Sequence, residues 1–185
     1  MKKKHIIIIG IGIILSGLII FAIYQHKKTK EKQVIEKTFE FPKTISVNNT
    51  TEFKIDTMLM VVTNKMFKYD TINIDVFYIT TKLISNEFII HAHIIKHYFM
   101  PHSYILYLNK NLNRTQIHEV VMHELIHLDQ YESGDLIISE DGKFFIYKGK
   151  KIKMNSVSYY NRPYEKEAFA NTQRLLNEYY SIIKK

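Results

Sequence analysis

The sequence predicts an α+β fold for residues 44–185, in which helices and strands follow one another without a repeating unit. Apolar residues recur at helical spacing near residues 50–67, 113–133 and 163–183. Three runs rich in β-branched and aromatic residues lie between the first two of these helices. An Asp-Gly pair between two apolar runs, with a Lys-Gly turn after it, predicts a β-hairpin before the last helix. The expected order is helix, three-stranded sheet, helix, β-hairpin, helix.

The chain begins with a segment typical of a membrane anchor. After three lysines and a histidine, the nineteen residues 6–24 carry no charge. As a helix they would span about 28 Å, close to the roughly 30 Å of a bilayer's hydrocarbon core. The alternative is a cleaved signal peptide, but the run exceeds the usual apolar core of a signal and ends without a small-x-small cleavage site. We therefore expect residues 1–24 to form a single-pass transmembrane anchor.

The positive charge of the chain is concentrated beside this segment. Of the net charge of +8, residues 1–37 contribute +6 through eight lysines and two glutamates, so the remainder is nearly neutral. This distribution gives no support to a nucleic-acid partner. Lysines flank both ends of the apolar run, but a very short basic tail before a first hydrophobic segment is typical of an anchor whose N-terminus stays inside. We therefore expect the folded domain to be extracytoplasmic.

Residues 25–43 predict a juxtamembrane tether, because they are rich in Lys, Glu and Thr and end near a proline. Beyond them the composition does not change again, so residues 44–185 are expected to form one domain. The chain contains no cysteine, which excludes disulfides and thiolate metal ligands. Any metal site must therefore use histidine and carboxylate side chains.

The first element expected in this domain is a helix. Phe53, Met60 and Phe67 recur at helical spacing, and Asn49 or Thr50 precedes them as a possible cap. Three β-rich runs separated by polar turns follow it, and we expect them to pair as one sheet. These runs are residues 71–80, 87–96 and 103–108.

The next helix carries the motif from which a function can be inferred. Asn113 can cap this helix, and Gly134 can end it. Residues 123–127 read H-E-L-I-H, the pattern H-E-x-x-H. His123 and His127 lie on one face of the helix, where both imidazoles can bind one Zn²⁺. Glu124 lies next to this face, so it would be placed to accept a proton from a water molecule.

Three other histidines do not fit this pattern. His118 begins a similar string, but Met122 stands where its second ligand would be, so we expect His118 to be a solvent or groove residue. His91 and His93 alternate on one strand face without an evident carboxylate partner. We interpret them as structural or substrate-groove residues.

A catalytic zinc needs a third protein ligand, and the last helix, from about Pro163 to Ile183, offers two candidates. Glu165 and Glu167 point about 200° away from each other on a helix, so only one of them can face the motif helix. The face at positions 165, 168, 172, 175, 179 and 182 is mainly apolar, whereas that at 167, 171, 174 and 178 is polar. We therefore expect Glu165 to be the third ligand, with Glu167 as the alternative.

Through these residues the chain resembles the gluzincin zinc metallopeptidases. In many members of that family the third ligand lies in E-x-x-A-D or E-x-E-A-N on a later helix, and E-K-E-A-F at residues 165–169 is similar to this. Phe169 stands where Asp or Asn is common, and E-x-x-A-N at residues 167–171 would restore that acceptor, which keeps Glu167 open. In that family, the position that corresponds to Asp129 is usually occupied by an uncharged residue. The element order from about residue 50 resembles a minimal zincin-like domain, nearest in size to small bacterial membrane-associated members.

The resemblance implies a membrane-anchored zinc endopeptidase that acts on a peptide or protein substrate. Zn²⁺ would activate a water molecule with Glu124 as the general base, and the edge strand of the sheet would pair with an extended peptide. Tyrosines available to stabilise the oxyanion are Tyr131, Tyr159 and Tyr160. The alternative is a catalytically inactive zincin-like domain that serves as a metal-stabilised binding or assembly module. The presence of Glu124 favours the enzyme, because a binding module needs no base.

Overall fold

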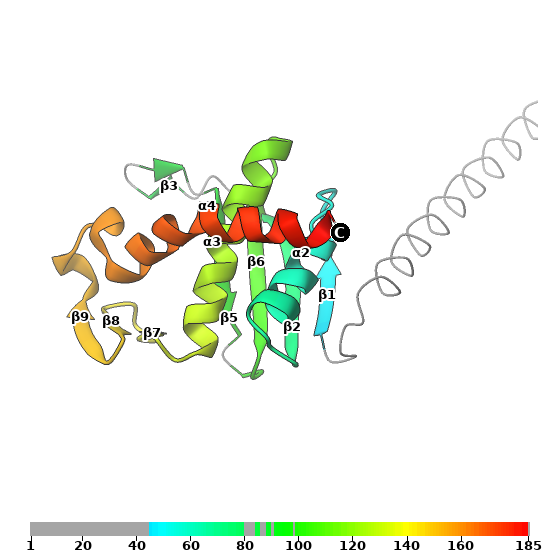
Figure 1. Cartoon of the computed structure of the whole chain (residues 1–185). Helices are drawn as coiled ribbons and strands as arrows, with labels where there is room; N and C mark the ends of the chain where they lie inside the picture. The colour runs from blue at the N-terminus through cyan, green and yellow to red at the C-terminus, as the bar shows by residue number, and fades with distance from the viewer. Residues whose placement is uncertain (1–44, 80–83, 86–87, 90, 98, 185) are drawn as a thin grey trace, which may run out of the picture. The chain divides into compact units, whose positions relative to one another are not determined.

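The computed structural model describes residues 45–79, 84–85, 88–89, 91–97 and 99–184 (Figure 1). The predicted anchor and tether, which together cover residues 1–43, lie outside these ranges. Within the described part of the chain, no helix combines the length and apolar character that crossing a membrane requires.

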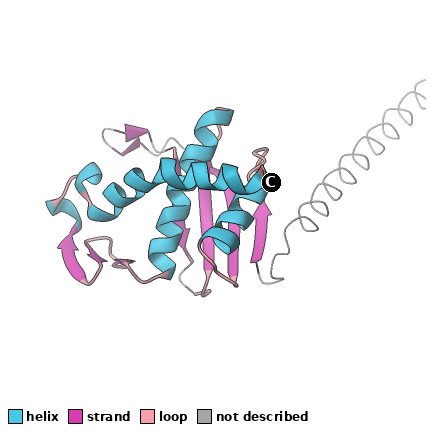
Figure 2. Cartoon of the chain, viewed as in Figure 1, coloured by secondary structure: helices cyan, strands magenta, loops and turns pink. Residues whose placement is uncertain are grey.

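A four-stranded sheet lies in the unit that runs from Pro42 to Lys185 (Figure 2). Its strand order is β1-β2-β6-β5, made of β1 (Ile45–Asn49), β2 (Ile72–Ile79), β6 (Ser103–Asn109) and β5 (Ala92–Lys96). The first three strands in this order are parallel, whereas β5 runs antiparallel to β6 at one edge. A separate short pair consists of β3 (Ile84–Ser85) and antiparallel β4 (Phe88–Ile89).

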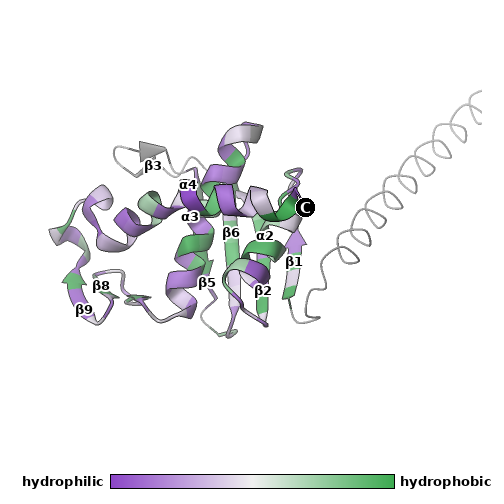
Figure 3. Ribbon diagram, viewed as in Figure 1, coloured by the Kyte–Doolittle hydropathy of each residue, from purple (hydrophilic) through white to green (hydrophobic). Residues whose placement is uncertain are grey.

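Side-chain alternation makes one face of this sheet apolar and buried. On β2 and β6 the buried residues of that face are Ile72, Ile74, Val76, Tyr104, Leu106 and Leu108. Figure 3 shows the hydrophobic residues of these strands and of the helices beside them. The opposite face keeps Phe77 of β2 and Ile95 of β5 more than one-third exposed. The helix that carries residues 123–127 packs against β5 of this sheet.

The first helix is shorter than its sequence pattern predicts. Helix α2 spans Asp56–Val61 and continues as a π-helical turn, Val62–Met66, so it ends near the expected residue. The predicted cap at Asn49 or Thr50 is wrong, because Asn49 ends β1 and its side-chain amide donates to the Phe53 carbonyl (2.7 Å) and the Asp56 carboxylate (2.6 Å). These hydrogen bonds hold the intervening residues in a loop, which helical spacing alone does not reveal.

Two long helices pack against each other, α3 (Arg114–Glu132) and α4 (Pro163–Ile183) (Figure 1). The predicted cap of α3 is confirmed: the Asn113 carboxamide oxygen accepts from the backbone N–H groups of Thr115 and Gln116, and the Gln116 side chain completes a capping box. Gly134, with φ of 78°, follows the end of this helix as expected. Pro163 occupies the first turn of α4, where its missing N–H has no cost.

The predicted hairpin is extended to a three-stranded antiparallel sheet of β7 (Leu136–Ile138), β8 (Phe144–Tyr147) and β9 (Lys150–Lys153). Its second turn is a two-residue loop in which Lys148 and Gly149 both have positive φ, 47° and 78°, which fits a tight hairpin. Two 3₁₀ turns, Met154–Ser156 and Tyr159–Asn161, lead from β9 to α4.

The structure confirms a mixed fold of helices and sheets and corrects two details of the strands. Only Ala92–Lys96 of the predicted run at residues 87–96 joins the main sheet. The fourth strand, β1, was not predicted, because its partner β2 follows only after α2, and such distant pairing leaves no local signal.

Candidate metal centre

Two helices bring the three predicted ligands together. His123 and His127 lie one turn apart on α3, and Glu165 lies in the first turn of α4. All three residues are buried, with exposed fractions of 9, 7 and 4%. The two Nε2 atoms are 3.2 Å apart, and each lies 3.2 Å from Glu165 Oε2. The sequence spacing therefore predicted a real cluster in the fold.

This triangle of atoms fits a tetrahedral metal ion. Bonds of about 2.0–2.1 Å to such an ion place its ligand atoms roughly 3.3–3.4 Å from one another. The observed separations of 3.2 Å are close to that value. Imidazole nitrogen and carboxylate oxygen are ligands that Zn²⁺ accepts, and three protein ligands leave a fourth position for water or substrate. The residues present thus suit a catalytic type of zinc site.

The charges of the group also favour a cation. Burial raises the pKa of the Glu165 carboxyl, but hydrogen bonds and charge from His123 and His127 outweigh this effect and hold the pKa at about 2. Glu165 is therefore ionised at neutral pH. Burial lowers the pKa of His127, whereas its hydrogen bond to Glu165 and the charge of Glu124 raise it above the usual value. The ionised Glu165 carboxylate between the two imidazoles therefore favours a bound cation.

Glu165 enters the ligand cluster and Glu167 does not, as the helical periodicity predicts. Glu165 and Ala168 of the predicted inner face are buried, whereas Glu167 is half-buried. The Glu167 carboxylate accepts hydrogen bonds from the Tyr147 hydroxyl and the Lys148 ammonium, the latter at 3.0 Å. Glu167 thereby ties α4 to β8 and its turn.

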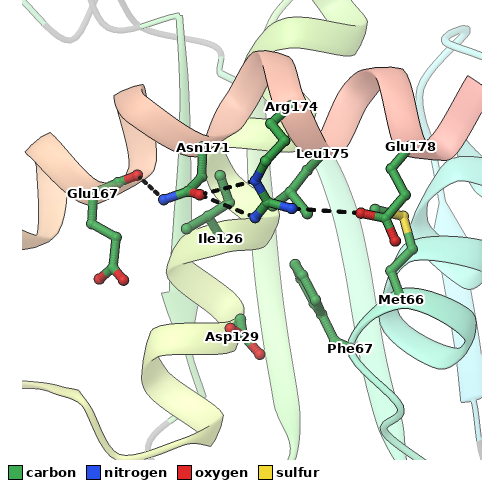
Figure 4. A pocket seen from close by; sticks show the side chains of 9 residues that line it. All are labelled: Met66, Phe67, Ile126, Asp129, Glu167, Asn171, Arg174, Leu175 and Glu178. Carbon is green, nitrogen blue, oxygen red and sulfur yellow. Dashed lines mark hydrogen bonds and ion pairs between the residues drawn. The ribbon is translucent and has the colours of Figure 1, made fainter.

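The polar face of α4 borders a separate cleft of about 350 Å³. Figure 4 shows Arg174 reaching into it from α4, held by Asn171 and Glu178, opposite Phe67 and Asp129. Its lining residues are Met66, Phe67, Ile126, Asp129, Glu167, Asn171, Arg174, Leu175 and Glu178. The candidate ligands are not part of this lining, so the cleft is distinct from the metal centre. Asp129, unusual by comparison with the resembled family, accepts here from the Tyr69 hydroxyl at 2.8 Å.

Gln130 orients His127 and was not predicted from the sequence. The Gln130 amide donates to the Tyr164 carbonyl (3.1 Å) and the Glu167 carboxylate (3.2 Å). Its oxygen therefore faces His127 Nδ1 at 2.8 Å and accepts a hydrogen bond from the N–H at that position. With Nδ1 protonated, Nε2 carries the free lone pair that a metal ligand needs. The signal available in the sequence was its position three residues after His127, on the same helix face.

Glu124 is buried next to the group and touches the edge of the sheet. Its Oε2 accepts from the backbone N–H of Ile94 on β5 at 2.9 Å. The Asn109 N–H donates to the His91 carbonyl, and the His97 N–H donates to the Ser103 carbonyl. The odd-numbered residues along β5 are therefore the ones whose main-chain groups form hydrogen bonds with β6. The main-chain groups of Ile94 therefore point to the free edge of β5. Glu124 thus lies between the ligand cluster and an edge of β5 that pairs with no other strand among the described residues.

The other predicted histidines lie away from the cluster. His118 is half-buried, and its Nδ1 is 2.6 Å from the Tyr180 hydroxyl, so it links the beginning of α3 to the end of α4. His91 and His93 are exposed, and by strand alternation they lie on the face opposite the buried Ile94.

The three predicted tyrosines have different environments. Burial raises the pKa of the Tyr159 hydroxyl, and the charge of Glu165 together with a hydrogen bond to it raises the pKa further. Tyr131 packs against the apolar cluster of Leu136, Phe145 and Tyr164. Tyr160 is 52% exposed, and its ring centroid lies 5.8 Å from that of Phe169. Tyr159 is therefore the tyrosine whose hydroxyl lies at the ligand cluster and stays protonated.

Comparison of the chain with protein-family models, with curated proteins and with solved structures finds no match.

Proposed function

We propose that this protein is a membrane-anchored zinc endopeptidase with a zincin-like domain. The observation that carries the proposal is the buried triangle of His123, His127 and Glu165, with the carboxylate of Glu124 beside it at an open strand edge. A surface pair of histidines would account for neither the buried glutamate that meets both imidazoles nor the second carboxylate.

The residues around the triangle have separate roles in peptide hydrolysis. A bound Zn²⁺ would polarise the scissile carbonyl and lower the pKa of the attacking water. Glu124 accepts the proton of that water and delivers it to the leaving amine, and the N–H of Ile94 holds one of its carboxylate oxygens in place. The Tyr159 hydroxyl, protonated because its pKa is raised, donates to the developing oxyanion.

The substrate is an extended peptide that adds to the free edge of β5. Every second residue of this strand turns its N–H and C=O groups away from β6, as the pairing pattern shows. The N–H of Ile94 is occupied by Glu124, so a peptide that adds as a further strand would pair with the other outward-facing groups and pass Glu124.

The second candidate is a zincin-like module that binds metal without catalysis. Both candidates need the triangle of ligands, but the module needs neither the buried Glu124 nor an open strand edge. These two features favour the peptidase.

Replacement of Glu124 by Gln tests the proposal. The amide has nearly the same size but cannot accept a proton, so the purified full chain should keep about one zinc while peptide hydrolysis falls about 10²- to 10⁴-fold. The matched control is Glu119→Gln, an exposed position on the same helix, which should change neither value. Metal is measured by mass spectrometry and hydrolysis with a mixed library of quenched peptides. Wild-type protein without zinc after metal-replete expression contradicts the metal site, and zinc without hydrolysis favours the binding module.

A further inference from the structure

Three aromatic rings lie exposed beside the ligand cluster. Phe169 of α4 is 50% exposed, and Tyr160 and Tyr159 of the preceding 3₁₀ turn are 52% and 39% exposed. Each of these rings offers apolar area to solvent, which is unfavourable unless a ligand or partner covers it.

The rings form a continuous row that starts at a candidate ligand. The Phe169 ring centroid is 4.5 Å from that of His123. Tyr160 follows at 5.8 Å from Phe169, and Tyr159 at 5.3 Å from Tyr160. Phe169 lies one helical turn after Glu165, so its ring emerges on the same side of α4 as the carboxylate.

Shielding of the His123 imidazole from solvent does not explain why three aromatic rings lie in a row. One face of Phe169 against His123 would suffice for that purpose, yet half of Phe169 remains open and Tyr160 extends the aromatic surface away from the histidine. Ligand sites combine such apolar surface with a few polar groups that fix orientation, and here the polar groups are those of the ligand cluster and Glu124.

We propose that Phe169 and Tyr160 form a side-chain subsite that selects a large apolar or aromatic residue next to the peptide bond that is hydrolysed. This inference rests on the proposed peptidase function and names the class of substrate for the same site. The Arg162 guanidinium lies over the Tyr159 ring at 5.5 Å, so a basic side chain is disfavoured in this subsite.

The test uses the zinc-loaded full chain and a set of quenched peptides that differ at one central residue, Phe, Leu, Ala or Lys. Wild-type protein should cleave the Phe and Leu peptides at least about tenfold faster, in kcat/KM, than the Ala and Lys peptides. Phe169→Ala should bring the four values close together with zinc content unchanged. Tyr160→Ala, which is farther from the ligands, should reduce the preference by a smaller factor. Phe77→Ala removes an exposed ring on β2 and should leave the preference intact.

A binding measurement separates this inference from the peptidase proposal. Glu124→Gln protein is titrated with the same peptides, and Phe169→Ala is combined with it to remove the subsite. Cleavage without side-chain preference, or a preference that survives Phe169→Ala, overturns the subsite and leaves the peptidase standing. Selective binding of Phe peptides that depends on Phe169, with no hydrolysis by wild type, upholds the subsite and overturns the peptidase. Absence of both binding and cleavage overturns both.

Discussion

Glu165 and Glu167 are separated by one residue on α4, yet their surroundings differ completely. Glu165 meets two imidazoles in the interior, whereas the half-buried Glu167 accepts hydrogen bonds from Tyr147, Lys148 and the buried Gln130. The difference follows from helix geometry, because residues two apart point to nearly opposite sides.

Replacement of each glutamate by Ala should show which one binds the metal and which one only stabilises the fold. In Glu165→Ala a charged ligand is lost, so zinc affinity should fall by orders of magnitude and hydrolysis with it. In Glu167→Ala zinc should stay near one per chain, while the free energy of unfolding falls by about 1–3 kcal/mol through the lost hydrogen bonds to a charged group. Metal content and urea denaturation measure the two effects. Loss of zinc from Glu167→Ala alone would require α4 to be rotated by about half a turn.

Gln130 provides a test of how the histidines are oriented. Gln130→Leu keeps the approximate volume but removes the acceptor for His127 Nδ1. The imidazole is then free to change tautomer, and we expect zinc affinity to fall about 10- to 100-fold without loss of the fold. Competition with a fluorescent chelator measures this change. Gln173→Leu, at an exposed position of α4, is the control, and equal affinities in the two variants would exclude the orienting role.

At the scale of elements, Glu132 links the end of α3 to the sheet through hydrogen bonds and ion pairs. Its side chain is 5% exposed and accepts from the Tyr104 hydroxyl, with His102 Nδ1 at 2.6 Å and Lys96 Nζ at 3.6 Å. These three partners belong to β5, β6 and the turn between them. The position of α3, and therefore of its histidines, depends on this contact as well as on apolar packing.

This contact predicts a stability that depends on pH. Burial raises the pKa of Glu132, but the hydrogen bonds from Tyr104 and His102 and the charge of Lys96 outweigh it and lower the pKa below 4.5. The ionised carboxylate therefore stabilises the fold at neutral pH, and this stabilisation is lost as the pH falls from 4.5 through the folded-state value. Glu132→Gln should cost about 1–3 kcal/mol at neutral pH, and the difference from wild type should shrink below pH 4.5.

Urea denaturation across this pH range measures the effect, with Glu119→Gln on the same helix as the control. A difference between Glu132→Gln and wild type that stays constant with pH would show that folding does not lower the pKa of Glu132.

At the scale of the whole molecule, the folded unit bears the candidate site, and we expect the N-terminal segment to hold that site at a membrane. The uncharged residues 6–24 are long enough for one membrane span, and the basic residues beside them suit its interfaces. A peptidase fixed to a membrane meets substrates at or near that surface.

We expect the full chain to remain in the membrane fraction after carbonate washing, at its unprocessed length. A chain without residues 6–24 should be released, because no other stretch of the sequence has a comparable uncharged apolar run. Immunoblotting of washed membranes, with a peripheral membrane protein as the release control, measures this. A mature N-terminus beyond residue 24, found by terminal sequencing, would instead establish a cleaved signal.

The sequence by itself determined the features that depend on local spacing. The cap at Asn113, the shared face of His123 and His127 and the inward direction of Glu165 all follow from the helical repeat, because that repeat relates residues within a few positions of one another. The order of helices and strands was largely predictable for the same reason.

Only the tertiary structure decided the features that join distant segments. The pairing of β1 with β2, the hydrogen bond from Ile94 to Glu124, the choice of Tyr159 among three tyrosines and the packing of Phe169 on His123 each connect residues from different elements. Local spacing carries no information about such contacts, since they form only when the chain buries its apolar faces and brings these elements together.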